Sequence, residues 1–195
     1  TATTKKTKTK TVKAKVTPIP KLPAIPFAFE VLDAASKQRT KARKIEVLQR
    51  YPHDSIMALL IWNFDETVIS LLPEGDVPYG NTREDNSATG TLSDKINDAV
   101  SKMSEMDSTS LGAQDQGKAS IRKEYTKFYN FLKGGNDGLN SLRRETMFIN
   151  ILEGLHPLEA EILILVKDKK LSDKYKITKE IASAAYPQIT WGGRS

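Results

Sequence analysis

Apolar residues recur along most of this chain at the spacing of an α-helix, in stretches that end at proline or glycine. In the first half, the spacing predicts a long helix over 27–51 and a second helix from Asp54 or Ser55 to Leu72. A weaker pattern predicts a helix over 92–106, and the clearest one predicts a helix over 118–133. Residues 27–133 are therefore expected to be helical, apart from polar breaks.

The C-terminal part continues in the same way. The pattern predicts a helix over 141–155, and Pro157 is well placed as the first residue of a helix that continues over 158–170. Five consecutive apolar residues from Ile162 to Val166 would also suit a strand, but acidic residues before them and lysines after them favour a helix that is covered on several sides. Thr178 is expected to cap a last helix that ends at Tyr186.

These patterns predict an all-α fold, with a single helical domain of about six helices over 27–189. A loop-rich segment over 73–117 lies within this domain, and residues 190–195 form a C-terminal tail. Residues 1–26 are different, because prolines at 18, 20, 23 and 26 exclude a helix there. We expect an extended, Pro-rich N-terminal arm.

The arm also carries the positive charge of the protein. It holds seven Lys and no Asp or Glu, whereas the residues after Pro26 hold 23 basic and 24 acidic side chains. Residues 1–16 suit either a disordered, solubilising tail or a docking segment, while aliphatic residues between prolines favour docking for 17–27. The candidate partner-binding residues of the arm are Lys5, Lys6, Lys8, Lys10, Lys13, Lys15, Ile19, Leu22 and Ile25.

A second basic feature lies in the first predicted helix, where five cations occur within eight residues. On a continuous helix, Lys37, Lys41 and Lys44 would line up opposite the buried stripe. Such a face could follow phosphates or an acidic protein surface, or it could simply be a solvated helix face. The candidate basic helix face consists of Lys37, Arg39, Lys41, Arg43 and Lys44.

Catalytic chemistry has little support in the sequence. His53 and His156 are the only histidines, and each adjoins a proline at a predicted helix boundary, so we expect them to be structural or capping residues. The chain has no Cys, and no spacing typical of a metal site or a nucleophile elbow occurs, so no enzyme activity, metal or cofactor is predicted. Buried carboxylates with raised pKa values in a pocket would argue the other way. The absence of Cys suits a reducing compartment or an assembly without disulfides.

No apolar stretch of the signal-peptide type follows the lysines, and no run reaches the length of a membrane span, so a membrane is not an expected partner.

Three segments, over 29–49, 141–171 and 177–187, resemble a family of small uncharacterised proteins of T-even-like tailed phages, including cyanophages. The likeness covers roughly 27–72 and 118–189, and the three segments occur in the same order. The arm and part of 83–117 look like additions to the family pattern. The resemblance implies a phage origin, but no activity or catalytic residue.

Two non-enzymatic functions follow as predictions. In the first, the protein is a virion component of the phage head or neck that docks through its arm onto capsid, portal or neck proteins, and contacts packaged DNA without sequence preference. In the second, it acts in the cytoplasm of the infected cell as an accessory factor that binds nucleic acid or a host or phage polymerase through the arm and the basic helix face. The first is favoured, because aliphatic residues between prolines suit a protein surface better than phosphates. It implies membership of a homo- or hetero-oligomeric assembly.

Overall fold

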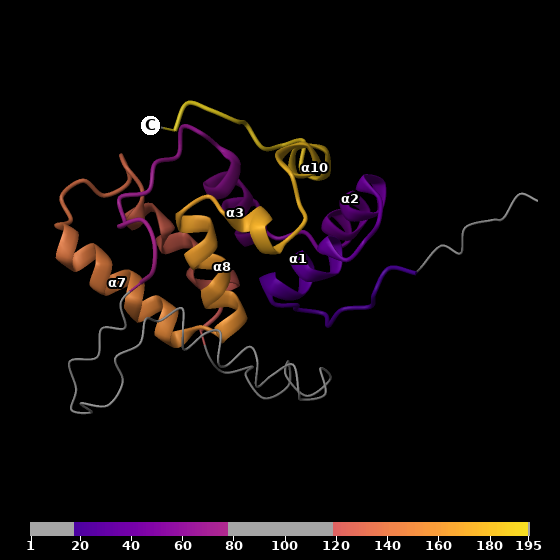
Figure 1. Ribbon diagram of the computed structural model, residues 1–195, viewed down its shortest axis with the longest axis horizontal. Helices are drawn as coiled ribbons and strands as arrows, with labels where there is room; N and C mark the ends of the chain where they lie inside the picture. The colour runs from indigo at the N-terminus through magenta and orange to yellow at the C-terminus, as the bar shows by residue number, and fades with distance from the viewer. Residues whose placement is uncertain (1–17, 78–118, 195) are drawn as a thin grey trace, which may run out of the picture.

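The computed structural model describes residues 18–77 and 119–194, and within them the predicted all-α fold is confirmed (Figure 1). The described residues form no β-strand beyond one isolated bridge. Their elements are α1 (Ala28–Ser36), α2 (Lys41–Arg50), α3 (Asp54–Phe64), α6 (Ile121–Glu124), the 3-10 helix η1 (Tyr125–Phe131), α7 (Ser141–Gly154), α8 (Pro157–Lys167), α9 (Leu171–Lys174) and α10 (Lys179–Ala185).

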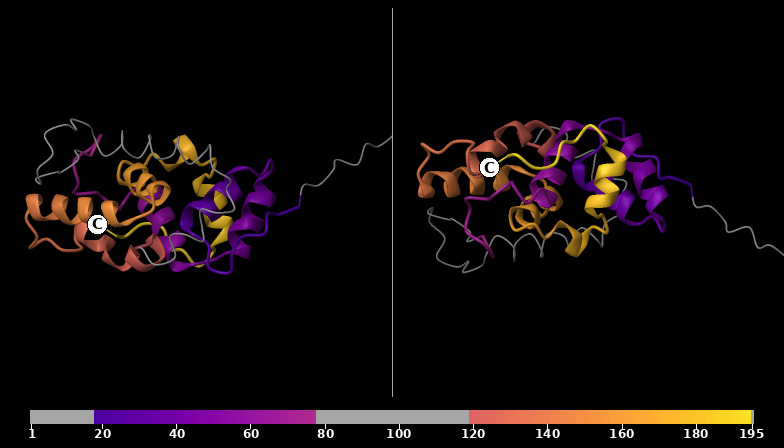
Figure 2. Two further views of the ribbon diagram at one scale, coloured as in Figure 1. Left: turned by 90° about the horizontal axis from the view of Figure 1, so that it is seen from below. Right: turned by 90° about the horizontal axis from the view of Figure 1, so that it is seen from above.

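Helix α8 lies at the centre of the described fold. It packs against α1, α3 and α7, and Ile162, Leu163 and Val166 are fully buried, which confirms the prediction of a helix covered on several sides. In both views of Figure 2, α7 lies at one end of the molecule and α1 and α2 lie at the other, with α8 between them. The buried apolar residues form one core cluster around it.

The prediction of one long helix over 27–51 is wrong. α1 ends at Ser36 and α2 begins at Lys41. Between them Thr40 is extended, and its hydroxyl accepts a hydrogen bond from the Arg43 amide at 3.3 Å, so that it caps α2. Six polar residues, 36–41, interrupt the apolar stripe at this point. No apolar side chain in this stretch could hold a continuing helix on the core.

The second helix also ends earlier than predicted, at Phe64 instead of Leu72. The Asp65 carboxylate accepts hydrogen bonds from the amide and hydroxyl of Thr67, and this local pairing competes with the helical hydrogen bonds. Residues 69–71 instead run beside 131–133, with hydrogen bonds from Leu71 N to Phe131 O at 2.8 Å and from Lys133 N to Ile69 O at 2.9 Å. Of the residues predicted to form a single α-helix over 118–133, the described residues 119–133 instead contain a short α-helix and a 3-10 helix.

The helices predicted in the C-terminal part are confirmed, with small shifts at their ends. α7 covers 141–154, Pro157 is the first residue of α8, and the Thr178 hydroxyl caps α10. α8 stops at Lys167, three residues before the predicted end, and α9 was not predicted. The helix predicted over 92–106 and most of the loop-rich segment lie outside the described residues, whereas 73–77 are described and non-helical.

The turn after η1 contains one glycine that the backbone requires. A side chain at Gly135 would overlap the carbonyl group of Tyr129, whereas a side chain at Gly138 would meet nothing closer than 4.0 Å. We expect Gly135→Ala to lower the free energy of unfolding by about 2 kcal/mol through overpacking. Gly138→Ala, the matched control, should change it by less than about 0.5 kcal/mol. Urea unfolding of both variants tests this, and equal stability would contradict the close approach.

Candidate functional site

The N-terminal arm is fixed to the helical body near its described end. Residues 18–27 are non-helical, as the prolines predicted. The phenol of Tyr51 in the α2–α3 connection accepts a hydrogen bond from Leu22 N at 3.0 Å and donates one to Pro20 O at 3.2 Å. In Figure 1 the described arm runs along the end of the molecule formed by α1 and α2. Tyr51 therefore fixes the described part of the arm to the body around residues 20–22.

The structure separates the three apolar arm residues that sequence reasoning grouped. Ile19 and Leu22 are half-buried and pack against the protein's own core, whereas Ile25 is 74% exposed. Only Ile25 is thus largely available to another molecule. The arm lysines at 5, 6, 8, 10, 13 and 15 lie outside the described residues.

Side chains from three helices hold the backbone where the arm joins α1. Arg122 of α6 reaches Pro26 O at 3.5 Å, and Glu30 of α1 accepts a hydrogen bond from Phe27 N at 3.1 Å. Glu159 of α8 accepts one from Ala28 N at 3.2 Å and another from Ile121 N at 3.1 Å. We call these contacts the arm junction, meaning residues 26–30 together with Ile121, Arg122, His156 and Glu159.

An aromatic stack covers the junction. The His156 ring is 2% exposed and lies 4.8 Å from the Phe29 ring and 5.7 Å from the Phe27 ring, measured between centroids. Its Nδ1 accepts a hydrogen bond from Leu158 N and so caps α8. His53 caps α3 in the same way through Ser55 N. The predicted capping role of both histidines is therefore confirmed.

Burial changes the acidity of the two junction carboxylates. Glu159 is completely buried, and this desolvation raises its pKa to about 7 against the opposing effect of the hydrogen bonds from Ile121 and Ala28. The nearby negative charge of Glu30 raises the pKa of Glu159 further, and Arg122 lowers it. Burial also raises the pKa of Glu30, although the Phe27 amide counteracts it.

The candidate basic helix face does not form as predicted. Because the chain is non-helical between α1 and α2, Lys37, Lys41 and Lys44 do not share one helix. The Lys44 ammonium is directed inward and donates to Ser36 O at 3.1 Å and Lys176 O at 2.7 Å. The prediction of one exposed row that includes Lys44 is thus wrong.

Three of the other four cations of the candidate basic helix face form ion pairs with carboxylates of the same chain. Ion pairs link Lys37 to Asp33 at 2.7 Å, Lys41 to Glu180 at 2.6 Å and Arg43 to Glu46 at 3.0 Å. Arg39 is exposed in the turn between α1 and α2. These exposed pairs reduce the local positive charge that a phosphate would meet.

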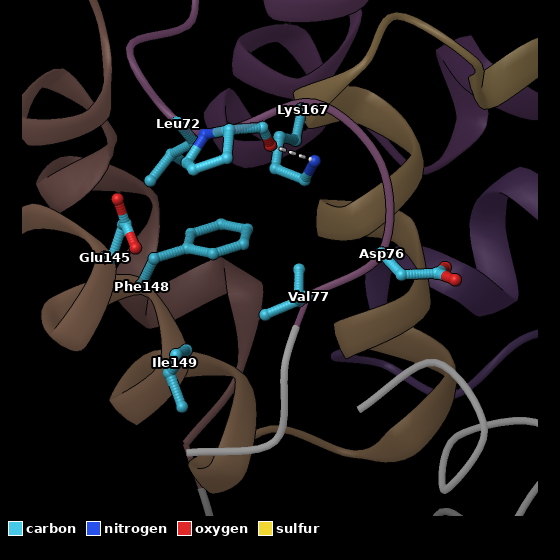
Figure 3. A pocket seen from close by; sticks show the side chains of 8 residues that line it. Leu72, Asp76, Val77, Glu145, Phe148, Ile149 and Lys167 are labelled. Carbon is cyan, nitrogen blue, oxygen red and sulfur yellow. Dashed lines mark hydrogen bonds between the residues drawn. The ribbon is translucent and has the colours of Figure 1, made fainter. Parts of the chain in front are cut away.

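A small cavity lies away from the junction, between α7 and the chain after α3 (Figure 3). Its volume of about 30 Å³ suits a single water molecule. Phe148, Leu72 and Val77 face it, while the Lys167 ammonium is turned toward Pro73 O at 2.7 Å (Figure 3). Lys167 also donates to Gly75 O and to Asp168. Neither Glu159 nor Glu30 is among the residues that line this cavity, so the carboxylates with raised pKa values and the cavity are separate features.

Two further cationic side chains also bind backbone groups, the buried Arg144 and the exposed Lys169. Arg144 donates to the carbonyls of Asn130, Asn136 and Leu139, and Lys169 donates to those of Trp62 and Asp65. In residues 18–77 and 119–194, no group of three or more His, Asp or Glu side chains could hold a metal ion. None of the helices in these residues is both long and apolar enough to cross a membrane.

Sequence reasoning missed the role of Glu159. In the sequence this residue is only an acidic residue near the start of a helix, where it favours the helix dipole. Its partner Ala28 lies 131 positions earlier in the chain. Glu159 and Glu161 both lie in the first turns of this helix, before the apolar run, and nothing in the local sequence indicates which of the two enters the core.

Comparisons with known proteins identify a family but no activity. The profile of a family of unknown function matches residues 31–106 and 107–173, which is most of the chain. No curated protein and no solved structure matches the chain.

Proposed function

The chain belongs to this family of unknown function, DUF6433, and we propose that it is a non-enzymatic structural protein of a phage virion. In this proposal the helical body sits in the head or neck, and the basic arm docks onto neighbouring capsid, portal or neck subunits, with packaged DNA as a further contact. The phage origin rests on the resemblance of three segments of the sequence described above.

The anchored base of the arm carries the proposal. Tyr51 and the junction fix residues 20–28 on the body, and Ile25 remains 74% exposed between these two attachments. A lysine-rich segment attached at a defined point can reach a neighbouring subunit with a smaller loss of conformational entropy than a tail joined through a flexible linker.

The environment of the buried charges supports a structural role over a catalytic one. The buried Glu159, Arg144 and Lys167 all bind backbone amides or carbonyls that join separate elements. The cavity in Figure 3 has room for about one water molecule, and its lysine already has three partners. This pattern is typical of groups that fix a fold.

The alternative function, an accessory factor that binds nucleic acid or a polymerase in the infected cell, has less support. Its basic helix face loses Lys44 to the interior, and three of its other cations are in ion pairs. It would depend mainly on the arm lysines.

The test compares virions of a phage that encodes the full chain with virions of a phage that encodes a chain lacking residues 1–17. Quantitative mass spectrometry of gradient-purified particles should find the full chain at a fixed ratio to the major capsid protein, and the shortened chain at no more than about one tenth of that ratio. The deletion leaves Ile19, Leu22 and the Tyr51 contacts intact, so the thermal midpoint of the isolated protein should not change.

Absence of the full chain from particles after a high-salt wash would overturn the proposal. In that case, recovery of the chain with infected-cell polymerase or replication complexes would identify the accessory function instead. A matched control replaces the exposed Lys123 and Lys170 of the body with Gln, which changes body charge without touching the arm and should leave incorporation unchanged.

A further inference from the structure

The N-terminal ends of three helices meet at the carboxylate of Glu159. Ala28 and Ile121 are the first residues of α1 and α6, and Glu159 is itself the third residue of α8. Each oxygen accepts one amide, Oε2 from Ala28 at 3.2 Å and Oε1 from Ile121 at 3.1 Å. This single side chain therefore joins α1, α6 and α8 at the base of the arm.

The charges that face Glu159 do not neutralise it. Glu30 approaches from α1 and repels it, whereas Arg122 of α6 attracts it weakly and directs its guanidinium at Pro26 O. Burial raises the pKa of Tyr175, which follows α9, and the negative charge of Glu159 adds to this increase, so the phenol stays protonated. His156 adjoins it as the cap of the same helix. No ion pair joins Glu159 to a cation in the described part of the chain.

We call the junction closed when Glu159 accepts the hydrogen bonds from Ala28 and Ile121. Two opposing effects decide whether the protonated or the ionised form of Glu159 is favoured in the closed junction. The two amide hydrogen bonds and the helix N-termini favour the carboxylate ion. Complete burial without an ion-paired cation disfavours it, and burial is the larger effect.

We propose that Glu159 is a proton-sensitive clasp of the arm junction, which holds α1, α6 and α8 together most tightly while it is protonated and loosens them when it ionises. The clasp can open without unfolding the protein, because Ala28 and Ile121 are terminal residues of their helices. Opening admits water to the carboxylate and releases the amide that directly follows the arm.

The linkage between proton binding and opening determines whether a rise in pH favours the open or the closed junction. The pKa of Glu159 is raised to about 7 in the closed junction and returns toward its ordinary value of 4.5 in an open, hydrated one. The closed form therefore binds the proton more tightly, and opening becomes easier as pH rises from 4.5 to about 7. The resulting change in opening between pH 5.5 and 8.5 is about 30-fold if opening hydrates the carboxylate fully.

The clasp does not depend on the proposed function. An effect of the clasp on docking does rest on the proposed function. If the arm docks onto neighbouring subunits, its attachment to the body would be looser on the alkaline side of neutrality.

The experiment is an NMR titration of the full chain between pH 4 and 9. The carboxyl carbon of Glu159 and the amide protons of Ala28 and Ile121 should shift together with a midpoint between about 6 and 8. Hydrogen exchange of these two amides, corrected for its intrinsic pH dependence, should accelerate about 30-fold from pH 5.5 to 8.5. The exchange of α10, which packs mainly against α2 and α3, should change far less.

Glu159→Gln should abolish this pH dependence, whereas Glu153→Gln, an exposed change on α7, should retain it. A Glu159 carboxyl that titrates near 4.5, amide shifts that do not follow it, or an equal acceleration in every helix would each overturn the clasp. If Glu159→Gln fails to fold, the titration of the unaltered protein decides alone. Failed virion incorporation with a normal titration would refute the proposed function but not the clasp.

Discussion

Asp65→Ala is expected to lower the free energy of unfolding by about 3 kcal/mol and to release the C-terminal tail from the body. Asp65 is 1% exposed and lies directly after α3. One carboxylate oxygen accepts hydrogen bonds from the amide and hydroxyl of Thr67. The other accepts hydrogen bonds from Gly192 N at 2.9 Å and from the Arg194 guanidinium at 2.8 Å. Without the carboxylate, these donors lose their acceptor, and residues 192–194 lose their main attachment.

The same residue should give the stability a defined dependence on acid. Burial opposes the charged form of Asp65, but the hydrogen bonds from Thr67, Gly192 and Arg194 outweigh it and lower the pKa to about 2. Because the folded pKa lies below the ordinary value of 3.8, the stabilisation is fully present above pH 3.8 and is lost as pH falls through about 2. Linkage limits this contribution to about 2 kcal/mol.

Urea unfolding at pH 7 and at pH 2.5 measures both effects. The difference between the unaltered protein and Asp65→Ala should shrink at the lower pH. Asp173→Ala, an exposed change on α9, is the control and should cost less than about 0.5 kcal/mol. An Asp65→Ala protein as stable as the control, or one whose tail amides keep their protection from exchange, would contradict the account of the tail.

Lys167→Met is expected to be at least as damaging, with a loss of about 3–5 kcal/mol. The side chain of Lys167 is 1% exposed, and its ammonium donates to Pro73 O, Gly75 O and Asp168 at 2.7–2.9 Å. Methionine has a similar shape but no donor, so two carbonyls and one carboxylate would be left without this partner. The loop after α3 should then detach from the end of α8.

Lys170→Met provides the matched control, because Lys170 is exposed three residues later and should be nearly neutral. Thermal unfolding compares the two variants, and backbone amide shifts of residues 73–77 report the local change. Equal midpoints for the two variants would show that the buried ammonium contributes little.

The sequence by itself determined the fold class and much of the C-terminal part. Helices over 141–154 and 157–167 followed from apolar periodicity. Pro157 marked the start of α8 because proline fixes φ, and Thr178 marked the start of α10 because a hydroxyl can cap an amide. His53 and His156 were expected as capping residues, which the structure confirmed, because each lies beside a proline at the end of an apolar pattern. These features depend on residues within a few positions of one another.

Tertiary structure alone decided the arm junction and the orientation of the charges. Glu159 meets Ala28 across 131 positions, Lys44 turns inward to Lys176 O across 132, and Asp65 binds Arg194 across 129. Periodicity records which face of a helix is apolar, but it does not record which distant amide or carbonyl will lie beside a charged side chain once the helices pack. That pairing depends on desolvation and on the hydrogen bonds available in the folded core, which local sequence does not contain.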